Sequence, residues 1–330
     1  MNPSMKPLLA PVDAVDQPVL QRAREIYAQR FGDALDAVQV KSLTSEFGTD
    51  VATAVLYAHF EALWLADETI QRADGDDRRP LLLAIAPGAF YKQHPEVGAD
   101  GRELIEMAAG QLWDCQLIPC ESLGTLSVNA EIINQFLQSK QGTHRVVLVS
   151  LSKGTADTLA AQRMRPDLFD SLTAWVSVSG VWHGTMMSDW LLDKWYLKPV
   201  LKLMLWRHAV TQQPVEDLRY RPFLEHEAER PCGCPLYHLA AFPLQRHLSC
   251  RRARMWHRRF RRHGPNDSVV LLEDLLGLPG SVIPVWGADH YLQGTWNAAH
   301  VVSQLVSRWQ PETIDSAESR NESETSAAEA

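Results

Sequence analysis

Ser152 occupies a position where a serine could act as a nucleophile. The residues before it, 146–149, form a β-branched and leucine run that predicts a strand buried on both faces. After it, apolar residues recur at helical spacing until Pro166 ends the pattern. A sharp turn from strand to helix lifts the central serine clear of the sheet and points the first helical amides at whatever the serine attacks. Gly154 suits such a turn, because strand and helix backbones approach closely there.

The serine alone does not establish this chemistry. A serine hydroxyl is a weak nucleophile unless a base takes its proton, and the base needs a partner that orients it and stabilises its cationic form. A Ser/Gly loop between an ordinary strand and helix is an equally good interpretation of the motif alone, because five-residue matches arise by chance. The order of the residues downstream decides between the two interpretations.

The segment Ser150-Leu151-Ser152-Lys153-Gly154 resembles the G-x-S-x-G elbow of the α/β-hydrolase superfamily, in its lipase and esterase type. Ser150 stands where that pattern has its first glycine, and its side chain is small enough to fit. The resemblance covers residues 81–309 and implies an α/β fold with a doubly wound, mostly parallel sheet. It also implies strands ahead of residue 81, and the sequence there shows no convincing ones.

The resemblance implies a base and an acid for Ser152. In α/β hydrolases these follow in the order Ser, Asp or Glu, His, each on a loop at the carboxyl end of a strand. Asp267, in Asn-Asp-Ser-Val, is similar to the acid loop of many lipases, and His290, in Gly-Ala-Asp-His, is similar to their histidine loop. Asp274, in a segment predicted to be helical, is the second choice for the acid. Asp289 is disfavoured, because sequence neighbours rarely orient each other in this way.

The resemblance also implies an oxyanion hole. Residues 81–86 are the first clear buried strand, and Pro-Gly-Ala-Phe follows them. A glycine in this loop lets the chain turn tightly and present its next amide to a developing negative charge. The implied donors are the backbone amides of Ala89 and Lys153, with Phe90 as the alternative to Ala89. Without the resemblance, Pro-Gly would indicate a plain turn.

The remaining pattern predicts an alternation of strands and helices. Amphipathic helices are expected near residues 19–27 and over 51–70, and further strands near 115–118, 173–179, 236–242 and 282–286. We expect an N-terminal helical segment (1–79), a hydrolase core in two parts (80–180 and 235–310), a lid or cap insertion (181–234) and a disordered acidic tail (311–330).

The segment 181–234 lies where the resembled family inserts a lid. It contains four tryptophans with many leucines between them. Such a lid would line an acyl-binding pocket, since large apolar pockets suit acyl chains. We expect Met186, Met187 and Trp190 to contact substrate. The alternative is that these side chains only pack the insertion onto the sheet.

Composition narrows the class of protein. No run of 18 apolar residues exists, so no membrane-spanning segment is expected. Five cysteines without a framework pattern predict reduced thiols and a cytoplasmic location. The net charge is −8, of which the tail from residue 311, with six acidic residues and one arginine, supplies most. The cysteine and histidine spacing over 232–250 does not match that of zinc ligands, so neither a metal nor an organic cofactor is expected.

Residues 251–262 contain seven arginines interleaved with Met255, Trp256 and Phe260. Such a run is typical of nucleic-acid or anionic-membrane binding. We favour a solvated basic helix and no nucleic-acid partner, because the chain as a whole is not basic.

Together these patterns predict a serine hydrolase that cleaves a carboxylic ester with an apolar acyl or alcohol portion through an acyl-enzyme. The substrate would be a small-molecule or lipid-like ester. An acyltransferase or thioesterase using the same three residues is one alternative, because the acyl group can pass to another acceptor. A non-catalytic binding protein on the same fold, with the arginine helix as its contact surface, is the other.

Overall fold

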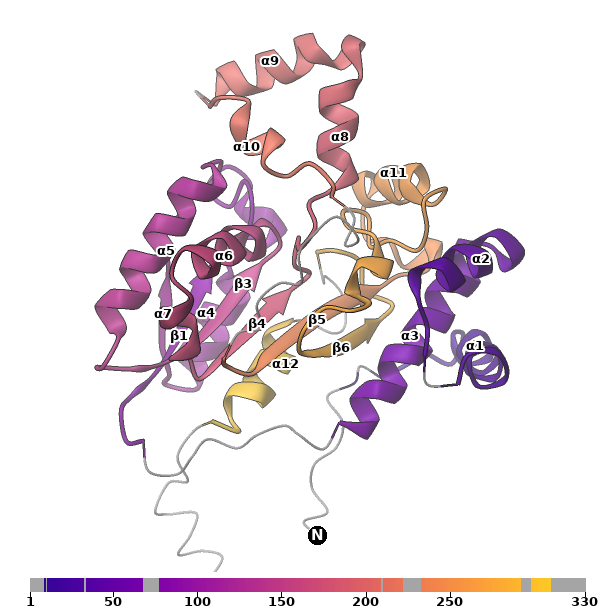
Figure 1. The fold of residues 1–330 in the computed structure, drawn as a ribbon, viewed down its shortest axis with the longest axis horizontal. Helices are drawn as coiled ribbons and strands as arrows, with labels where there is room; N and C mark the ends of the chain where they lie inside the picture. Colours follow the sequence, from indigo (N-terminus) through magenta and orange to yellow (C-terminus); the bar gives the residue numbers. More distant parts are fainter. Residues whose placement is uncertain are drawn as a thin grey trace, which may run out of the picture.

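A six-stranded parallel sheet forms the centre of the computed structural model, which describes residues 9, 11–32, 34–67, 77–208, 210–221, 233–291 and 298–309 (Figure 1). The strand order is β2-β1-β3-β4-β5-β6, and all five neighbouring pairs are parallel. The strands are β1 (Leu81–Ala86), β2 (Asp114–Leu117), β3 (Arg145–Leu151), β4 (Ala174–Val178), β5 (Leu236–Phe242) and β6 (Ser281–Trp286). The predicted doubly wound parallel sheet is confirmed, and every predicted strand is present within two residues of its expected bounds.

The central strands are buried along their whole length. Every residue of β1, β3, β4 and β5 is buried. Helices cover both faces of such a sheet, so its strands carry continuous apolar runs in place of an alternating pattern. This is why the strands could be recognised from the sequence.

Helices form a layer on each face of the sheet. The described helices are α1 (Gln17–Arg30), α2 (Ala37–Phe47), α3 (Thr49–Ala66), α4 (Arg102–Gly110), α5 (Leu126–Lys140), α6 (Lys153–Met164), α7 (Pro166–Asp170), α8 (Met186–Asp193), α9 (Lys198–Arg207), α10 (Gln213–Glu216), α11 (Arg251–Phe260) and α12 (Ala298–Val306). Short 3-10 turns are η1 (Pro95–Val97), η2 (Trp195–Leu197), η4 (Gln245–His247) and η5 (Leu272–Leu275). One face packs against α4 and α12, and the other against α5, α6 and α7. In the described part of the chain, no helix combines the length and the hydropathy that crossing a bilayer requires.

The N-terminal helices α1–α3 complete the second of these layers. Ala240 and Phe242 of β5 point to the same side of the sheet as Leu236, which packs with the α5–α7 layer. Tyr57 of α3 meets the rings of Phe242 and Trp286 edge-on, with centroids 5.7 and 5.0 Å away. The helices therefore cover the β5–β6 half of the face that α5–α7 leave open (Figure 1).

A buried carboxylate ties the start of the chain to the last strand. Asp16, just before α1, accepts a hydrogen bond from Trp286 Nε1 at 2.8 Å and lies 3.0 Å from His247 Nε2. Arg246 pairs with the same carboxylate. In the described residues no strand precedes β1, so the early strands implied by the resemblance are not found there.

The β4–β5 crossover, residues 181–221 of the described chain, stands apart from the sheet (Figure 1). It carries α8, η2, α9 and α10. The three helices share a small apolar cluster, to which the loop residue Val210 also belongs: Leu192, Leu201, Leu205, Val210 and Val215. Its role as a lid and the predicted domain boundaries stay predictions. The acidic tail predicted at 311–330 lies outside the described residues, as does the predicted end of the second helix at Ile70.

Replacing Tyr57 by Ala tests whether α1–α3 belong to the same folding unit as the sheet. The side chain is fully buried, so its removal should lower the free energy of unfolding by roughly 3–5 kcal/mol. Urea denaturation followed by circular dichroism measures the loss. Leu65→Ala, on the same helix but 56% exposed, is the control and should change it by less than about 0.5 kcal/mol. A cost for Tyr57→Ala as small as that of the control would show that the helices add nothing to the fold.

Candidate active site

Ser152 sits at a strained turn between β3 and α6. Its backbone has φ 49° and ψ −114°, a conformation that L-residues rarely adopt. Three hydrogen bonds hold it: Ser152 N–H donates to the Val178 carbonyl at 3.0 Å, and the amides of Thr155 and Val181 donate to the Ser152 carbonyl at 3.0 and 3.1 Å. A Cβ on Gly154 would lie only 2.4 Å from the Ala86 carbonyl oxygen, so this position requires glycine.

Ser150, the departure from the resembled motif, is part of a buried polar cluster. Its hydroxyl accepts a hydrogen bond from Trp175 Nε1 at 2.8 Å and lies 2.9 Å from Thr155 Oγ1. Thr155 Oγ1 in turn lies 3.0 Å from Ser177 Oγ, to which Trp182 Nε1 donates. The serine at this position therefore links β3, β4 and the start of α6 beneath the nucleophile candidate.

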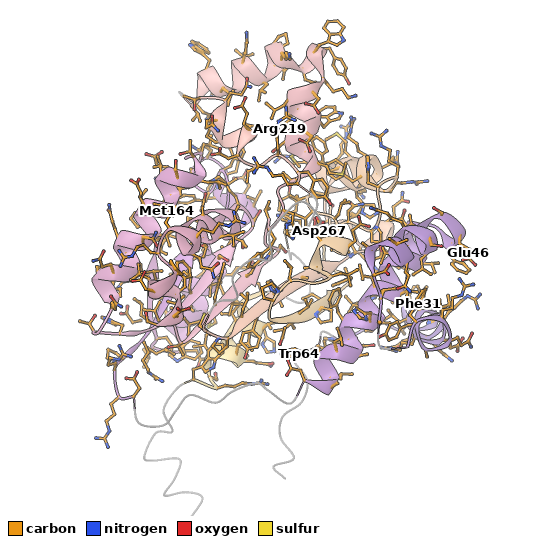
Figure 2. The ribbon with its side chains drawn as sticks, viewed as in Figure 1. Phe31, Glu46, Trp64, Met164, Arg219 and Asp267 are labelled. Carbon is orange, nitrogen blue, oxygen red and sulfur yellow. The ribbon has the colours of Figure 1, made fainter. Side chains whose placement is uncertain are left out.

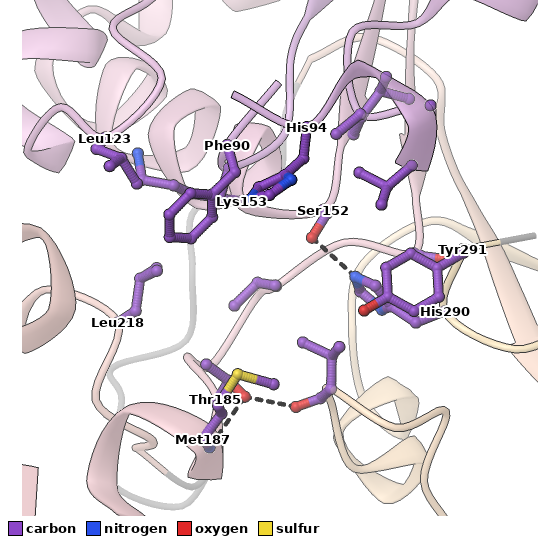
Figure 3. A pocket seen from close by; sticks show the side chains of 18 of the residues that line it. Phe90, His94, Leu123, Ser152, Lys153, Thr185, Met187, Leu218, His290 and Tyr291 are labelled. Carbon is purple, nitrogen blue, oxygen red and sulfur yellow. Dashed lines mark hydrogen bonds between the residues drawn. The ribbon is translucent and has the colours of Figure 1, made fainter. Parts of the chain in front are cut away.

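The structure brings Ser152, His290 and Asp267 into one hydrogen-bonded chain (Figure 3). Ser152 Oγ lies 2.8 Å from His290 Nε2, and His290 Nδ1 lies 2.8 Å from Asp267 Oδ2. Both distances are those of good hydrogen bonds. With the proton on Nδ1, Nε2 is free to accept the serine proton, which is the arrangement that base catalysis needs. Their catalytic roles stay predictions.

Asp267 is fixed by its own loop. Its Oδ1 accepts hydrogen bonds from the amides of Val269 and Val270, both at 2.8 Å, which leaves Oδ2 for the imidazole. The His290 amide donates to the Asp267 carbonyl at 3.0 Å, so the two loops are also joined through the backbone. The carboxylate is 1% exposed and lies near the middle of the molecule (Figure 2).

Three further contacts hold these loops, and the sequence analysis did not identify them. Asp289 Oδ2 accepts from the amide and hydroxyl of Ser249 at 2.8 and 2.6 Å, which anchors the histidine loop. His257 Nδ1 of α11 lies 3.1 Å from the Asn266 carbonyl oxygen. Thr185 Oγ1, at the start of the crossover, donates to the Val269 carbonyl at 2.6 Å. The amphipathic spacing of α11 was a usable signal for His257, whereas nothing local in sequence marked Ser249 or Thr185.

Asp274, the alternative acid, lies elsewhere. It follows the start of η5 and accepts a hydrogen bond from Tyr220 Oη at 2.8 Å. Burial raises the pKa of its carboxyl to about 7, against which the Tyr220 hydrogen bond acts only in part. The hydrogen bond to His290 comes from Asp267. The geometry therefore favours Asp267 over Asp274 as the partner of the imidazole.

Two backbone amides are available beside Ser152. The Phe90 amide is occupied by the Ser122 carbonyl at 3.2 Å, which favours Ala89 as the donor from this loop. Within the described part of the chain, neither the Ala89 nor the Lys153 amide has a hydrogen-bond acceptor. Phe90 has a positive φ of 60°, and the turn that this creates follows Ala89 directly. The side chain of Lys153 is buried and pairs with Asp157 at 2.6 Å, so only its amide is offered to the site.

A cavity of about 540 Å³ opens over Ser152 and His290. This volume is within the usual range for small-molecule sites. Apolar side chains dominate its wall: Leu104, Leu123, Val178, Val181, Met187, Leu191, Leu205, Val210, Val215, Leu218, Trp256 and Val269. Figure 3 shows Phe90, Leu218 and Met187 around the serine and histidine. Arg252 of α11 is a cationic side chain on the wall.

Of the three predicted substrate contacts, the structure places one on the cavity. Met187 lines it, whereas Met186 and Trp190 are not among its lining residues, so the geometry favours Met187 as the contact. Trp190 meets Trp256 of α11 edge-on at 5.1 Å, and the Arg259 guanidinium lies 4.1 Å from the centre of its ring. Trp190 therefore joins α8 to α11 and has its ring turned to that helix.

Comparison with solved structures identifies the fold. A metagenomic carboxyl esterase superposes with a TM-score of 0.52 at 18% sequence identity, covering 91% of this chain and 96% of the esterase. The propeptide form of a Bacillus licheniformis lipase, BlEst2, also gives 0.52 at 15% identity, covering 71% of this chain and 52% of the lipase. Both are α/β-hydrolase fold enzymes. The chain has the α/β-hydrolase fold. No protein-family model and no curated protein matches the sequence.

The α/β-hydrolase fold explains why the three residues meet. Ser152 and His290 closely follow the carboxyl ends of β3 and β6, which in a parallel sheet lie along one edge. Asp267 lies in the β5–β6 connection, after α11, and its carbonyl accepts from the His290 amide. In the described residues no group of three His, Cys, Asp or Glu side chains is placed to hold a metal ion. The chemistry that this arrangement offers is attack by a serine hydroxyl, with an imidazole as base and two amides as oxyanion donors.

Replacing Asp274 by Asn should change how stability depends on pH. The unfolded chain releases this proton near the ordinary value of 3.8, whereas the folded protein holds it until about pH 7. In the wild type, the protonated Asp274 therefore makes its full contribution to the free energy of unfolding below pH 3.8. That contribution is lost as the pH rises to about 7. Asn does not titrate, so the variant lacks this loss. The free energy of unfolding of the variant minus that of the wild type should therefore rise by about 1–3 kcal/mol between acidic and neutral pH.

Thermal and urea unfolding at several pH values measure this difference. Tyr220→Phe is the companion variant, because it removes the hydrogen bond that lowers the Asp274 pKa and should steepen the wild-type trend. Parallel curves for the wild type and Asp274→Asn would contradict the assignment of a raised pKa.

Proposed function

We propose that this protein is a serine hydrolase that cleaves a carboxylic ester with an apolar acyl or alcohol portion. The observation that supports it is the hydrogen-bonded chain from Ser152 through His290 to Asp267 at the wall of a mostly apolar cavity. A non-catalytic binding protein has no need of this alignment. The esterase and lipase among the structural neighbours carry the same fold, and the activity is proposed from the site.

In the proposed reaction, Ser152 Oγ attacks the ester carbonyl carbon as His290 Nε2 takes its proton. The carbonyl oxygen becomes an oxyanion, which the amides of Ala89 and Lys153 stabilise by hydrogen bonds. When the tetrahedral intermediate collapses, the C–O bond to the alcohol breaks and His290 returns the proton to the leaving oxygen. Asp267 holds the imidazole in the required tautomer and stabilises its cationic form.

Water completes the cycle. It attacks the acyl-serine carbonyl while His290 takes its proton, and the acid product leaves as Ser152 regains its hydrogen. The proposed role of the β4–β5 crossover is that of a lid. Its side chains Met187, Leu191, Leu205 and Leu218 line the cavity and would contact the apolar portion of the ester.

A fluorophosphonate probe should label Ser152 stoichiometrically, because it reacts only with an activated serine. Ser152→Ala should abolish labelling and lower hydrolysis of p-nitrophenyl esters by a factor on the order of 10⁴ or more. Mass spectrometry of the labelled peptide identifies the residue. Stoichiometric labelling of a different serine would contradict the assignment.

The acid provides the matched control in the same assay. Asp267→Asn should lower turnover by roughly 10⁴-fold, because the imidazole loses its orienting partner. Asp274→Asn changes a carboxyl that bonds to Tyr220, so we expect a much smaller loss of turnover. The opposite ranking of these two variants would show that the acid is misassigned.

Met187→Ala should flatten the preference for longer acyl chains. Each methylene buried in the cavity contributes up to about 0.8 kcal/mol, so kcat/KM should rise from acetyl esters until the cavity is full. Removing Met187 from the wall should reduce that rise more than it reduces acetyl turnover. Met186→Ala is the matched control, since Met186 is the adjacent residue and does not line the cavity. A wild-type kcat/KM that falls steadily from acetyl upward would contradict an apolar acyl site.

A further inference from the structure

The outer surface of the β4–β5 crossover exposes large apolar side chains. Trp195 and Trp206 are each 79% exposed, Val200 and Leu203 are each 62% exposed, and Tyr196 is 51% exposed. All five fall within η2 and α9, the part of the chain that projects farthest from the sheet (Figure 1). Apolar groups gathered in this way mark a surface that binds something.

Helix α9 carries apolar side chains on two opposite sides. Leu201 and Leu205 are buried in the cluster beneath it. Val200, Leu203 and Trp206 recur every three residues and so share the opposite side of the helix. A helix packed on one side and exposed on the other would normally carry polar residues outward. In the described part of the chain, packing explains the inner face only.

Cationic side chains surround this apolar face. Residues 194–207 contain Lys194, Lys198, Lys202 and Arg207 and no acidic residue. Residues 251–262 add seven arginines, again with no acidic residue. The chain as a whole has a net charge of −8, so the concentration of positive charge is local to these two segments.

The two segments form one surface. Trp190 of α8, just before the first segment, packs against the second, with its ring against Trp256 and the Arg259 guanidinium over it. A groove then runs between the crossover and α11, lined by Lys194, Tyr196, Arg251, Arg254, Met255 and Arg258 among others, with no acidic side chain in its lining. We call this groove, together with the exposed side chains of η2 and α9, the basic-aromatic face.

We propose that the basic-aromatic face docks on the surface of an anionic phospholipid bilayer. Tryptophan and tyrosine prefer the headgroup level of a membrane, where their rings are half in hydrocarbon and half in water. Lysine and arginine beside them pair with lipid phosphates, and each adds to the attraction toward an anionic surface. Val200 and Leu203 favour lipid over nucleic acid, because exposed aliphatic side chains find no partner on a phosphate backbone.

Docking in this way would bring the candidate active site to the membrane. The inner sides of α8, α9 and α11 carry Leu191, Leu205 and Trp256, which line the cavity over Ser152. The same helices therefore lie between the proposed lipid surface and the cavity. Membrane docking goes beyond the proposed hydrolysis and does not depend on it.

Vesicle co-sedimentation of the Ser152→Ala protein tests docking without any hydrolysis. Binding to phosphatidylcholine vesicles that contain about 30% phosphatidylglycerol should exceed binding to pure phosphatidylcholine by roughly tenfold or more. Raising NaCl to about 0.5 M should weaken it, since salt screens the attraction. The double variant Arg254→Glu/Arg258→Glu should lose roughly tenfold in partitioning, and Trp195→Ser/Trp206→Ser roughly fivefold or more.

Matched variants elsewhere on the surface provide the controls. Arg22→Glu/Arg78→Glu reverses two exposed charges outside this face, and Val15→Ser/Val38→Ser removes two side chains that are 75% and 76% exposed. Both should bind vesicles as the parent does, with thermal unfolding confirming that all variants fold.

Four results would overturn the proposal. The first two are equal binding to neutral and anionic vesicles and no binding to either. The third is a loss of binding in the control variants as large as in the variants of the face. The fourth is self-association of the protein at assay concentrations that buries the exposed tryptophans. Binding to an oligonucleotide in place of vesicles would identify a different partner for the same face.

Discussion

Ser152 keeps a backbone conformation that costs of order 1–3 kcal/mol in an L-residue, and the rest of the site depends on what holds it there. The serine amide donates to the carbonyl of Val178, the last residue of β4. The serine carbonyl accepts from the amides of Thr155, in α6, and Val181, just after β4. Gly154 allows α6 to begin close to the carbonyls of Ala86, the last residue of β1, and Pro87. The hydrogen bonds to β4 and the close approach to β1 therefore hold Ser152 at the cavity, with the start of α6 beside it.

Several contacts also hold the imidazole of His290 in place. Its acid partner has one oxygen saturated by two amides, its loop is bonded to the acid loop through the backbone, and its neighbour Asp289 is anchored to Ser249. A histidine fixed in this way loses little entropy when it begins to act as a base. The helix rich in arginines contributes to this order through His257 on its buried face, while most of its arginines lie on the exposed face.

Sequence patterns predicted the strands well because full burial leaves a continuous apolar signal, as in Leu81–Ala86. They missed α2, whose start is marked by a capping box between Asp36 and Gln39 but whose apolar stripe is short. Asp267 and His290 could be chosen because chain order and strand ends are visible in sequence. Which residues of 181–234 line the cavity could not be predicted, because composition identifies an apolar segment but not which side of each helix faces inward. Only the packing of α8 against α11 decides that.

The hydrogen bond from Thr185 to the Val269 carbonyl joins the first residues of the crossover to the loop that carries the acid. The segment above the cavity is thus not an independent module that could be exchanged between proteins of this fold. A chimera with the crossover of another protein would lose this hydrogen bond unless it kept Thr185, even if every residue of the Asp267 loop were unchanged. Changes in the segment that lines the cavity are therefore coupled, through Val269, to the geometry of the Asp267–His290 pair.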